Sequence, residues 1–110
     1  MDYKFRVEFL QEAKDFLDGL DEKAKEKILY NIWKSRFVSD NELFKKLQDE
    51  IWEFRTKYSK TYYRLFAFWD KSNKDDTVVI STHGLIKKTD KTPKTEILRI
   101  KYFNHKNKKK

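Results

Sequence analysis

Apolar residues alternate with charged ones at the start of the chain and then recur at helical spacing. Residues 4–10 follow the period of two that is typical of a half-buried strand. From Leu10 to Leu20 the apolar residues return every three or four positions, and Gly19 is a natural helix end. The sequence therefore predicts a strand followed by a short helix.

A second helix is predicted directly after the first. Asp21 is a suitable N-cap residue. The expected apolar stripe consists of Ala24, Ile28, Ile32, Trp33 and Phe37. Two short helices joined at a glycine form an antiparallel hairpin. A polar connector at 39–42 and a short apolar stretch at 43–47 follow.

The remaining chain has the pattern of a β-sheet with one last helix. The predicted strands are 51–58, 61–70 and 77–84, separated by short polar turns. Pro93 suits the first turn of a helix of about ten residues. This order predicts an α+β fold, a small and mostly antiparallel sheet with an N-terminal helical hairpin and a C-terminal helix, the helices lying on one face.

Composition places the chain among small single domains. The 110 residues include only two glycines and one proline, so we expect one domain over residues 1–104 and a basic, disordered tail over 105–110. Cysteine is absent, which excludes disulfides and thiolate metal sites. The charged N-terminus does not resemble a signal peptide, and no apolar run suits a membrane helix. These features predict a cytoplasmic protein without membrane association.

The positive charge is concentrated in the second half of the chain. Residues 1–50 carry 10 basic and 12 acidic side chains, a net charge of −2, whereas residues 51–110 carry 16 and 6, a net charge of +10. One part of the surface must therefore be positive, which favours a polyanionic partner such as nucleic acid.

Two arginines fall inside apolar strands. Strand alternation places Arg55 and Arg64 on one face of neighbouring strands, where we expect them to be exposed. Either each arginine pairs with a carboxylate, Glu53 being nearest, or the two grip phosphate through their guanidinium groups. The lysines that follow favour phosphate. Residues 83–94 hold four of them, although lysine-rich loops are often merely solvated.

Most other catalytic arrangements are missing from the sequence. His83 and His105 have no spacing that resembles a zinc site, and Gly19 and Gly84 are isolated. The paired carboxylates fall in a predicted hairpin loop (75–76) and at a predicted strand start (49–50), where we expect them to be solvated. A site of Arg, Lys, Tyr and His without metal suits RNA cleavage, because RNA supplies its own nucleophile in the 2′-OH group.

Three sequence blocks resemble those of the HigB branch of the RelE/ParE toxins. They are residues 49–55 (DEIWEFR), 63–66 (YRLF) and 83–89 (HGLIKKT), followed by Thr92-Pro93 and a helix. The resemblance spans residues 49 to about 100. It implies a RelE-like fold and metal-independent cleavage of mRNA on the ribosome, with no cofactor.

The resemblance also implies roles for individual residues. The expected catalytic residues are Arg55, Arg64, Lys87, Lys88, His83 and Tyr102. The expected RNA-binding residues are Lys57, Lys91, Lys94 and Lys101. Tyr102, His105 and His83 are alternatives for the general acid or base, although a histidine at a strand end is more often structural.

The implied partners are a HigA-like helix-turn-helix antitoxin, mRNA and the ribosome. Two other functions remain open on the same scaffold. One is a ParE-like inhibitor of a protein target such as gyrase. The other is a basic phage accessory protein that binds nucleic acid without catalysis.

Overall fold

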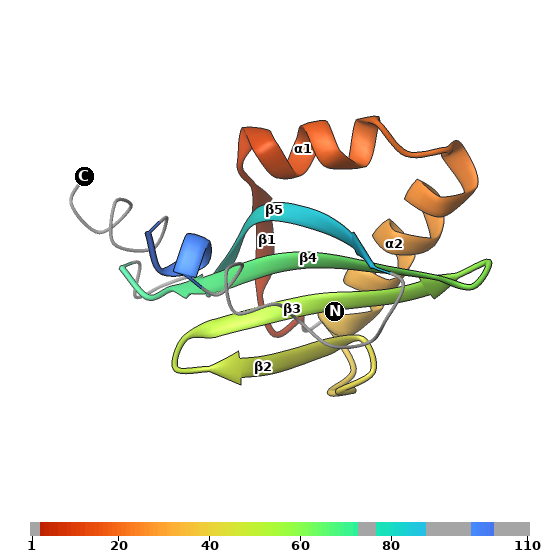
Figure 1. Ribbon diagram of the computed structural model, residues 1–110. Helices are drawn as coiled ribbons and strands as arrows, with labels where there is room; N and C mark the ends of the chain where they lie inside the picture. The colour runs from red at the N-terminus through yellow and green to blue at the C-terminus, as the bar shows by residue number, and fades with distance from the viewer. Residues whose placement is uncertain (1–2, 73–76, 88–97, 103–110) are drawn as a thin grey trace.

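A five-stranded sheet forms the centre of the molecule (Figure 1). The computed structural model describes residues 3–72, 77–87 and 98–102. The elements are β1 (Arg6–Phe9), α1 (Gln11–Asp18), α2 (Glu22–Ser35), β2 (Phe44–Gln48), β3 (Ile51–Tyr58), β4 (Thr61–Asp70) and β5 (Val78–Lys87). A short helical segment covers residues 98–102. The α+β class and the N-terminal helical hairpin are confirmed.

The sheet is mostly antiparallel, as predicted. Its strand order is β1-β5-β4-β3-β2, and among these described strands only the β1–β5 pair is parallel. The strands at 51–58 and 61–70 have the predicted bounds. Ser59 and Lys60 join them with φ values of 50° and 65°, which gives a tight two-residue hairpin turn.

Two expectations about these elements are wrong, and a third is met only in part. The stretch at 43–47 was not expected to be a strand, yet Phe44–Gln48 forms β2 at the sheet edge, where charged residues such as Lys45 and Lys46 are common. The last strand continues to Lys87, past the expected end at Gly84. The expected C-terminal helix is short where it is described, and its predicted start at Pro93 lies outside the described residues.

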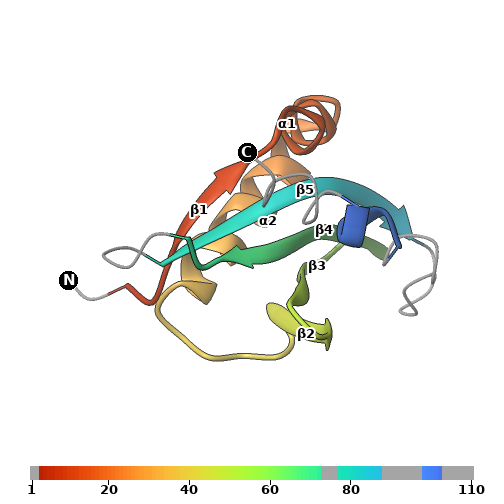
Figure 2. The ribbon, with the colours of Figure 1, turned by 90° about the vertical axis from the view of Figure 1, so that its left-hand side faces the viewer.

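The helices lie on both faces of the sheet, not on one (Figure 2). The hairpin covers one face, where Leu17 and Ile28 pack with Phe54 and Leu65 in a buried cluster. On the opposite face, Ile100 of the segment at 98–102 packs on a second apolar cluster. That cluster comprises Ile51, Phe66, Phe68, Val78 and Ile80. The sheet has this second core because its central strands bury apolar residues on both sides.

Helix α2 begins where the sequence predicted it. The side chain of Asp21 accepts a hydrogen bond of 2.9 Å from the backbone N–H of Ala24, which caps the helix. Its buried face includes Ile28 and Ile32, but Trp33, expected in the apolar stripe, is 49% exposed. The helix therefore presents a large aromatic ring to solvent.

Candidate RNA-binding face

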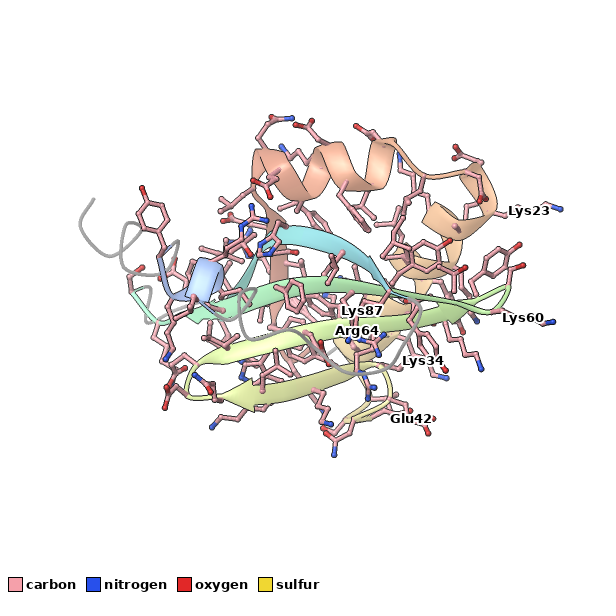
Figure 3. The ribbon with its side chains drawn as sticks, in the orientation of Figure 1. Lys23, Lys34, Glu42, Lys60, Arg64 and Lys87 are labelled. Atoms are coloured by element: carbon pink, nitrogen blue, oxygen red, sulfur yellow. The ribbon has the colours of Figure 1, made fainter. Side chains whose placement is uncertain are left out.

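Cationic side chains from three neighbouring strands meet on the sheet face opposite the helical hairpin. Arg55 of β3 is the Cα partner of Arg64 of β4, and in the adjacent row Lys57 pairs with Tyr62. Tyr62 in turn pairs with Lys87 of β5. Directly paired residues share a face of the sheet, so these side chains form one group. Figure 3 shows Arg64 and Lys87 close together over the strands.

Glu53 separates the two arginines. Its Oε2 atom lies 3.4 Å from Nε of Arg55, and its Oε1 atom lies 3.5 Å from Nε of Arg64. One carboxylate therefore offsets the repulsion between two opposed guanidinium groups. The pairing with Glu53 that the sequence left open is present. It does not exclude phosphate binding, because the positive charges of Arg55, Lys57, Arg64 and Lys87 together exceed the one negative charge of Glu53.

The expectation that both arginines are exposed is wrong. Arg64 is 2% exposed and Glu53 is 2% exposed, whereas the Arg55 side chain retains 15% exposure. Burial follows from the long strands on both sides of β4 and from the aliphatic part of the arginine packing among them. Arg64 is consequently part of the interior of the fold, and its replacement will affect stability.

Tyr62 brings two cations of this group to one aromatic ring. Nζ of Lys57 lies 5.3 Å from the ring centroid, and Cζ of Arg64 lies 5.6 Å from it. Both distances are within the range of a cation–π interaction. Tyr62 was not selected from the sequence, and the signal that would have found it is its position opposite Lys57 across the predicted hairpin.

A groove of about 510 Å³ borders this group and extends to helix α2. Arg55, Lys57, Tyr62 and Arg64 line its sheet side. Its other walls are formed by Lys27, Tyr30, Asn31 and Lys34 of α2, by Asp40, Glu42 and Leu43 of the following loop, and by Thr56. The α2 residues were missed in the sequence because a lysine on an exposed helix face carries no sign of what lies beside it.

His83 lies inside the sheet and not at a strand end. It is 1% exposed, its ring centroid is 5.1 Å from that of Phe66, and its Nδ1 atom lies 2.9 Å from Oγ1 of Thr82. The register of β4 and β5 shifts at this place, between Phe66 and Ala67. These contacts favour the structural role over proton transfer to a bound substrate.

The other expected residues are distributed differently. Lys87 belongs to the cationic group although it is only 7% exposed. Tyr102 is 63% exposed, and Lys101 is exposed beside it. Their segment is anchored by Ile100 near Phe68, four residues along β4 from Arg64, or about 13 Å at the rise of a strand. Lys88, Lys91, Lys94 and His105 lie outside the described residues.

The described part of the chain contains neither a metal-ligating cluster nor a helix suited to cross a membrane. Within residues 3–72, 77–87 and 98–102, no group of three or more His, Asp or Glu side chains is placed to hold a metal ion. None of the helices in these same ranges is long and apolar enough to cross a membrane.

The chain matches a known protein family over most of its length. Residues 15–102 match the family described as Phage derived protein Gp49-like (DUF891). The match covers well over half of the chain, so the protein belongs to this family, which is part of the RelE/ParE-like toxin superfamily. No curated protein matches the chain.

Proposed function

We propose that this chain is the toxin of a type II toxin–antitoxin system, of the HigB type, and cleaves mRNA on the ribosome without a metal ion. The observation that carries the proposal is the group of Arg55, Lys57, Arg64 and Lys87 on one sheet face, with Glu53 between the arginines. Membership of the toxin superfamily supports the same interpretation.

The proposed reaction uses the nucleophile that RNA carries. The 2′-oxygen attacks the adjacent phosphorus, the bond from phosphorus to the 5′-oxygen breaks, and a proton moves from the 2′-OH group to that leaving oxygen. The products are a 2′,3′-cyclic phosphate and a 5′-OH end. Fixed positive charges stabilise the crowded phosphate, and the ribosome contributes to aligning the strand.

The described residues are suited to different roles in the proposed reaction. Lys57 is exposed, Arg55 is partly exposed, and both border the groove, so they are placed to contact phosphate. Arg64 is buried beside Glu53 and Tyr62, where it acts mainly by positioning these side chains and by its charge. Tyr102 remains the described candidate for proton transfer, and its exposure leaves it accessible.

Ribosomes programmed with a defined mRNA provide the test. The purified chain should produce cleavage ends on ribosome-bound mRNA and none on free mRNA. A single 2′-deoxynucleotide at the cleavage position should abolish cutting there, because the nucleophile is gone. Cleavage that persists at the deoxynucleotide would contradict the proposed chemistry.

Expression in bacteria separates the alternatives. Parent chain and Lys57→Ala are compared, because Lys57 is exposed and its replacement leaves the buried ion pairs intact. Growth arrest with loss of mRNA in the parent, relieved in the variant, supports the nuclease. Arrest with intact mRNA and broken DNA would indicate a gyrase-type inhibitor, and the absence of arrest would indicate an accessory protein that only binds nucleic acid.

The partners follow from the same proposal. A toxin that arrests translation must be held inactive, and a HigA-like helix-turn-helix antitoxin is the expected neighbour. Co-expression of the protein encoded beside this chain should abolish arrest and yield a stable complex on purification.

A further inference from the structure

The groove beside the cationic group extends from the paired arginines onto helix α2. Lys27, Tyr30 and Lys34 contribute its helical wall, at successive turns of one face. In Figure 3, Lys34 lies near Arg64 with Glu42 below them, whereas Lys23 is at the far end of α2. The groove thus connects α2 directly with the candidate site.

The groove is open because β2 is shorter than β3. Pairing between these strands ends at Phe44 and Phe54, with one further backbone bond from the N–H of Arg55 to the carbonyl of Leu43. Beyond that point α2 is the element lying along β3. Nδ2 of the buried Asn31 donates a hydrogen bond of 3.0 Å to Oγ1 of Thr56, which ties the helix to the strand. Both residues line the groove, so this contact joins its helical wall to its strand wall.

Tyr30 lines the helical side of the groove, and the exposed ring of Trp33, which does not line it, lies beside Tyr30. Tyr30 is 52% exposed and Trp33 is 49% exposed, with ring centroids 6.1 Å apart. Nζ of Lys27 lies 5.7 Å from the centroid of Tyr30. Large exposed rings are uncommon on a surface that binds nothing, and rings next to lysines are typical of proteins that bind single strands.

We propose that this groove holds the single-stranded RNA on one side of the cleavage position, a proposal that rests on the proposed function. Lys27 and Lys34 bind phosphates, and a base stacks on Tyr30 with Trp33 beside it. The strand then passes Lys57 and Tyr62 to reach the arginines. Tyr30 and Lys34 are binding residues that align the strand, and they take no part in bond breaking.

Charge and shape favour RNA over an acidic protein as the occupant. Five cations line the groove, namely Lys27, Lys34, Arg55, Lys57 and Arg64. The two anions, Asp40 and Glu42, are both in the loop that forms the outer wall. They repel a phosphate backbone from that wall and so confine it to the side of α2. An acidic helix would neutralise the lysines equally well but would gain no stacking energy from a flat, exposed tyrosine.

The first measurement is the affinity of the full chain for a fluorescein-labelled oligoribonucleotide of about ten nucleotides, by fluorescence anisotropy. Tyr30→Ala should weaken binding at least about fivefold through loss of stacking, and Tyr30→Trp should retain it. Lys34→Glu should weaken binding. It should also reduce the slope of log affinity against log salt concentration by about 0.7 for each phosphate that the side chain no longer neutralises.

Lys23→Glu is the matched control. It makes the same charge change on the same helix, but Lys23 does not line the groove. Its salt slope and its affinity should stay close to those of the parent. If Lys23→Glu and Lys34→Glu weaken binding equally, the effect is one of overall charge and the proposed path is wrong. The path is also wrong if Tyr30→Ala weakens binding of an acidic peptide as much as that of RNA.

Ribosomal cleavage distinguishes this proposal from the proposed function. If the parent cleaves mRNA and Tyr30→Ala and Lys34→Glu bind and cleave as the parent does, the path is overturned while the nuclease stands. If the parent cleaves no mRNA, the proposed function fails, and the binding data still decide whether RNA occupies the groove.

Discussion

Arg55 and Arg64 face each other across β3 and β4 as direct Cα partners, and the carboxylate of Glu53 lies within 3.5 Å of both side chains. Two like charges in this position would destabilise a sheet. The shared carboxylate of Glu53 offsets the repulsion between the two guanidinium groups, and the surrounding face remains strongly positive. Stability and the candidate activity therefore depend on the same three residues.

Replacing Glu53 by glutamine should destabilise the protein. The change removes the charge that holds the opposed guanidinium groups, and loss of one partner from a buried ion pair costs about 3–5 kcal/mol. Urea unfolding measures the loss. Glu50→Gln is the control, because Glu50 pairs with Lys71 at the surface, 3.2 Å away, and should cost less than about 1 kcal/mol. Equal losses in the two variants would contradict the role of Glu53.

Gly84→Ala should also destabilise the fold. A Cβ atom at this position would lie 2.2 Å from the ring of Phe16, a residue of helix α1, so that ring must move. We expect a loss of about 1–3 kcal/mol in the free energy of unfolding. In a Phe16→Ala background the same substitution should cost much less, which a double-mutant cycle would reveal.

Gly19→Ala should stabilise the protein, in contrast to Gly84→Ala. Gly19 has a φ of −82°, and its added Cβ would meet nothing closer than 3.5 Å. Alanine reduces the freedom of the unfolded chain, so stability should rise by about 0.4–1 kcal/mol. Thermal unfolding of both variants checks the contrast, and a loss on Gly19→Ala would show that the C-cap needs glycine.

Asp21→Ala should loosen the start of α2. The substitution removes the hydrogen bond to the N–H of Ala24 and should cost about 0.5–2 kcal/mol, whereas Asp21→Asn keeps an oxygen acceptor and should cost little. The groove depends on the placement of α2, so RNA binding by Asp21→Ala provides a second readout.

A hydrogen-bonded carboxylate at the end of β4, that of Asp70, should make the stability of the protein depend on pH. Hydrogen bonds from the hydroxyl and backbone N–H of Ser72 hold the pKa of Asp70 below its ordinary value. Because this pKa is lower in the folded than in the unfolded chain, ionised Asp70 stabilises the fold at pH values above the unfolded pKa of about 3.9. The stabilisation is lost as the pH falls through the pKa of the folded state. Carboxyl titration by NMR should show the Asp70 pKa rising in Ser72→Ala. An unchanged titration would exclude Ser72 as the cause.

Local patterns were sufficient to predict much of the fold. The strands at 51–58 and 61–70 alternate clearly, and Asp21 marks the start of α2, so their positions follow from sequence alone. The edge strand β2 was missed because its paired lysines interrupt the alternation. Trp33 was assigned to the core by spacing, but it lies on the exposed side of α2, against the rings of Tyr30 and Phe37.

The candidate site was predictable only in part. Alternation placed Arg55, Arg64 and Lys57 on one face, and the structure agrees. The burial of Arg64 and its ion pair with Glu53 depend on how three strands pack, and no spacing along the chain encodes that. The groove residues of α2 lie 21 or more positions before those of β3 along the chain, and only the tertiary structure brings them together.

The place of β5 in the sheet has a consequence for the timing of assembly in the cell. Of the described strands β5 is the last to be synthesised, yet it lies between β1 and β4 and contributes Lys87 to the cationic face. A nascent chain therefore cannot complete that face until residue 87 has left the ribosome. Under the proposed function, the chain could not act on mRNA before β5 has joined the sheet.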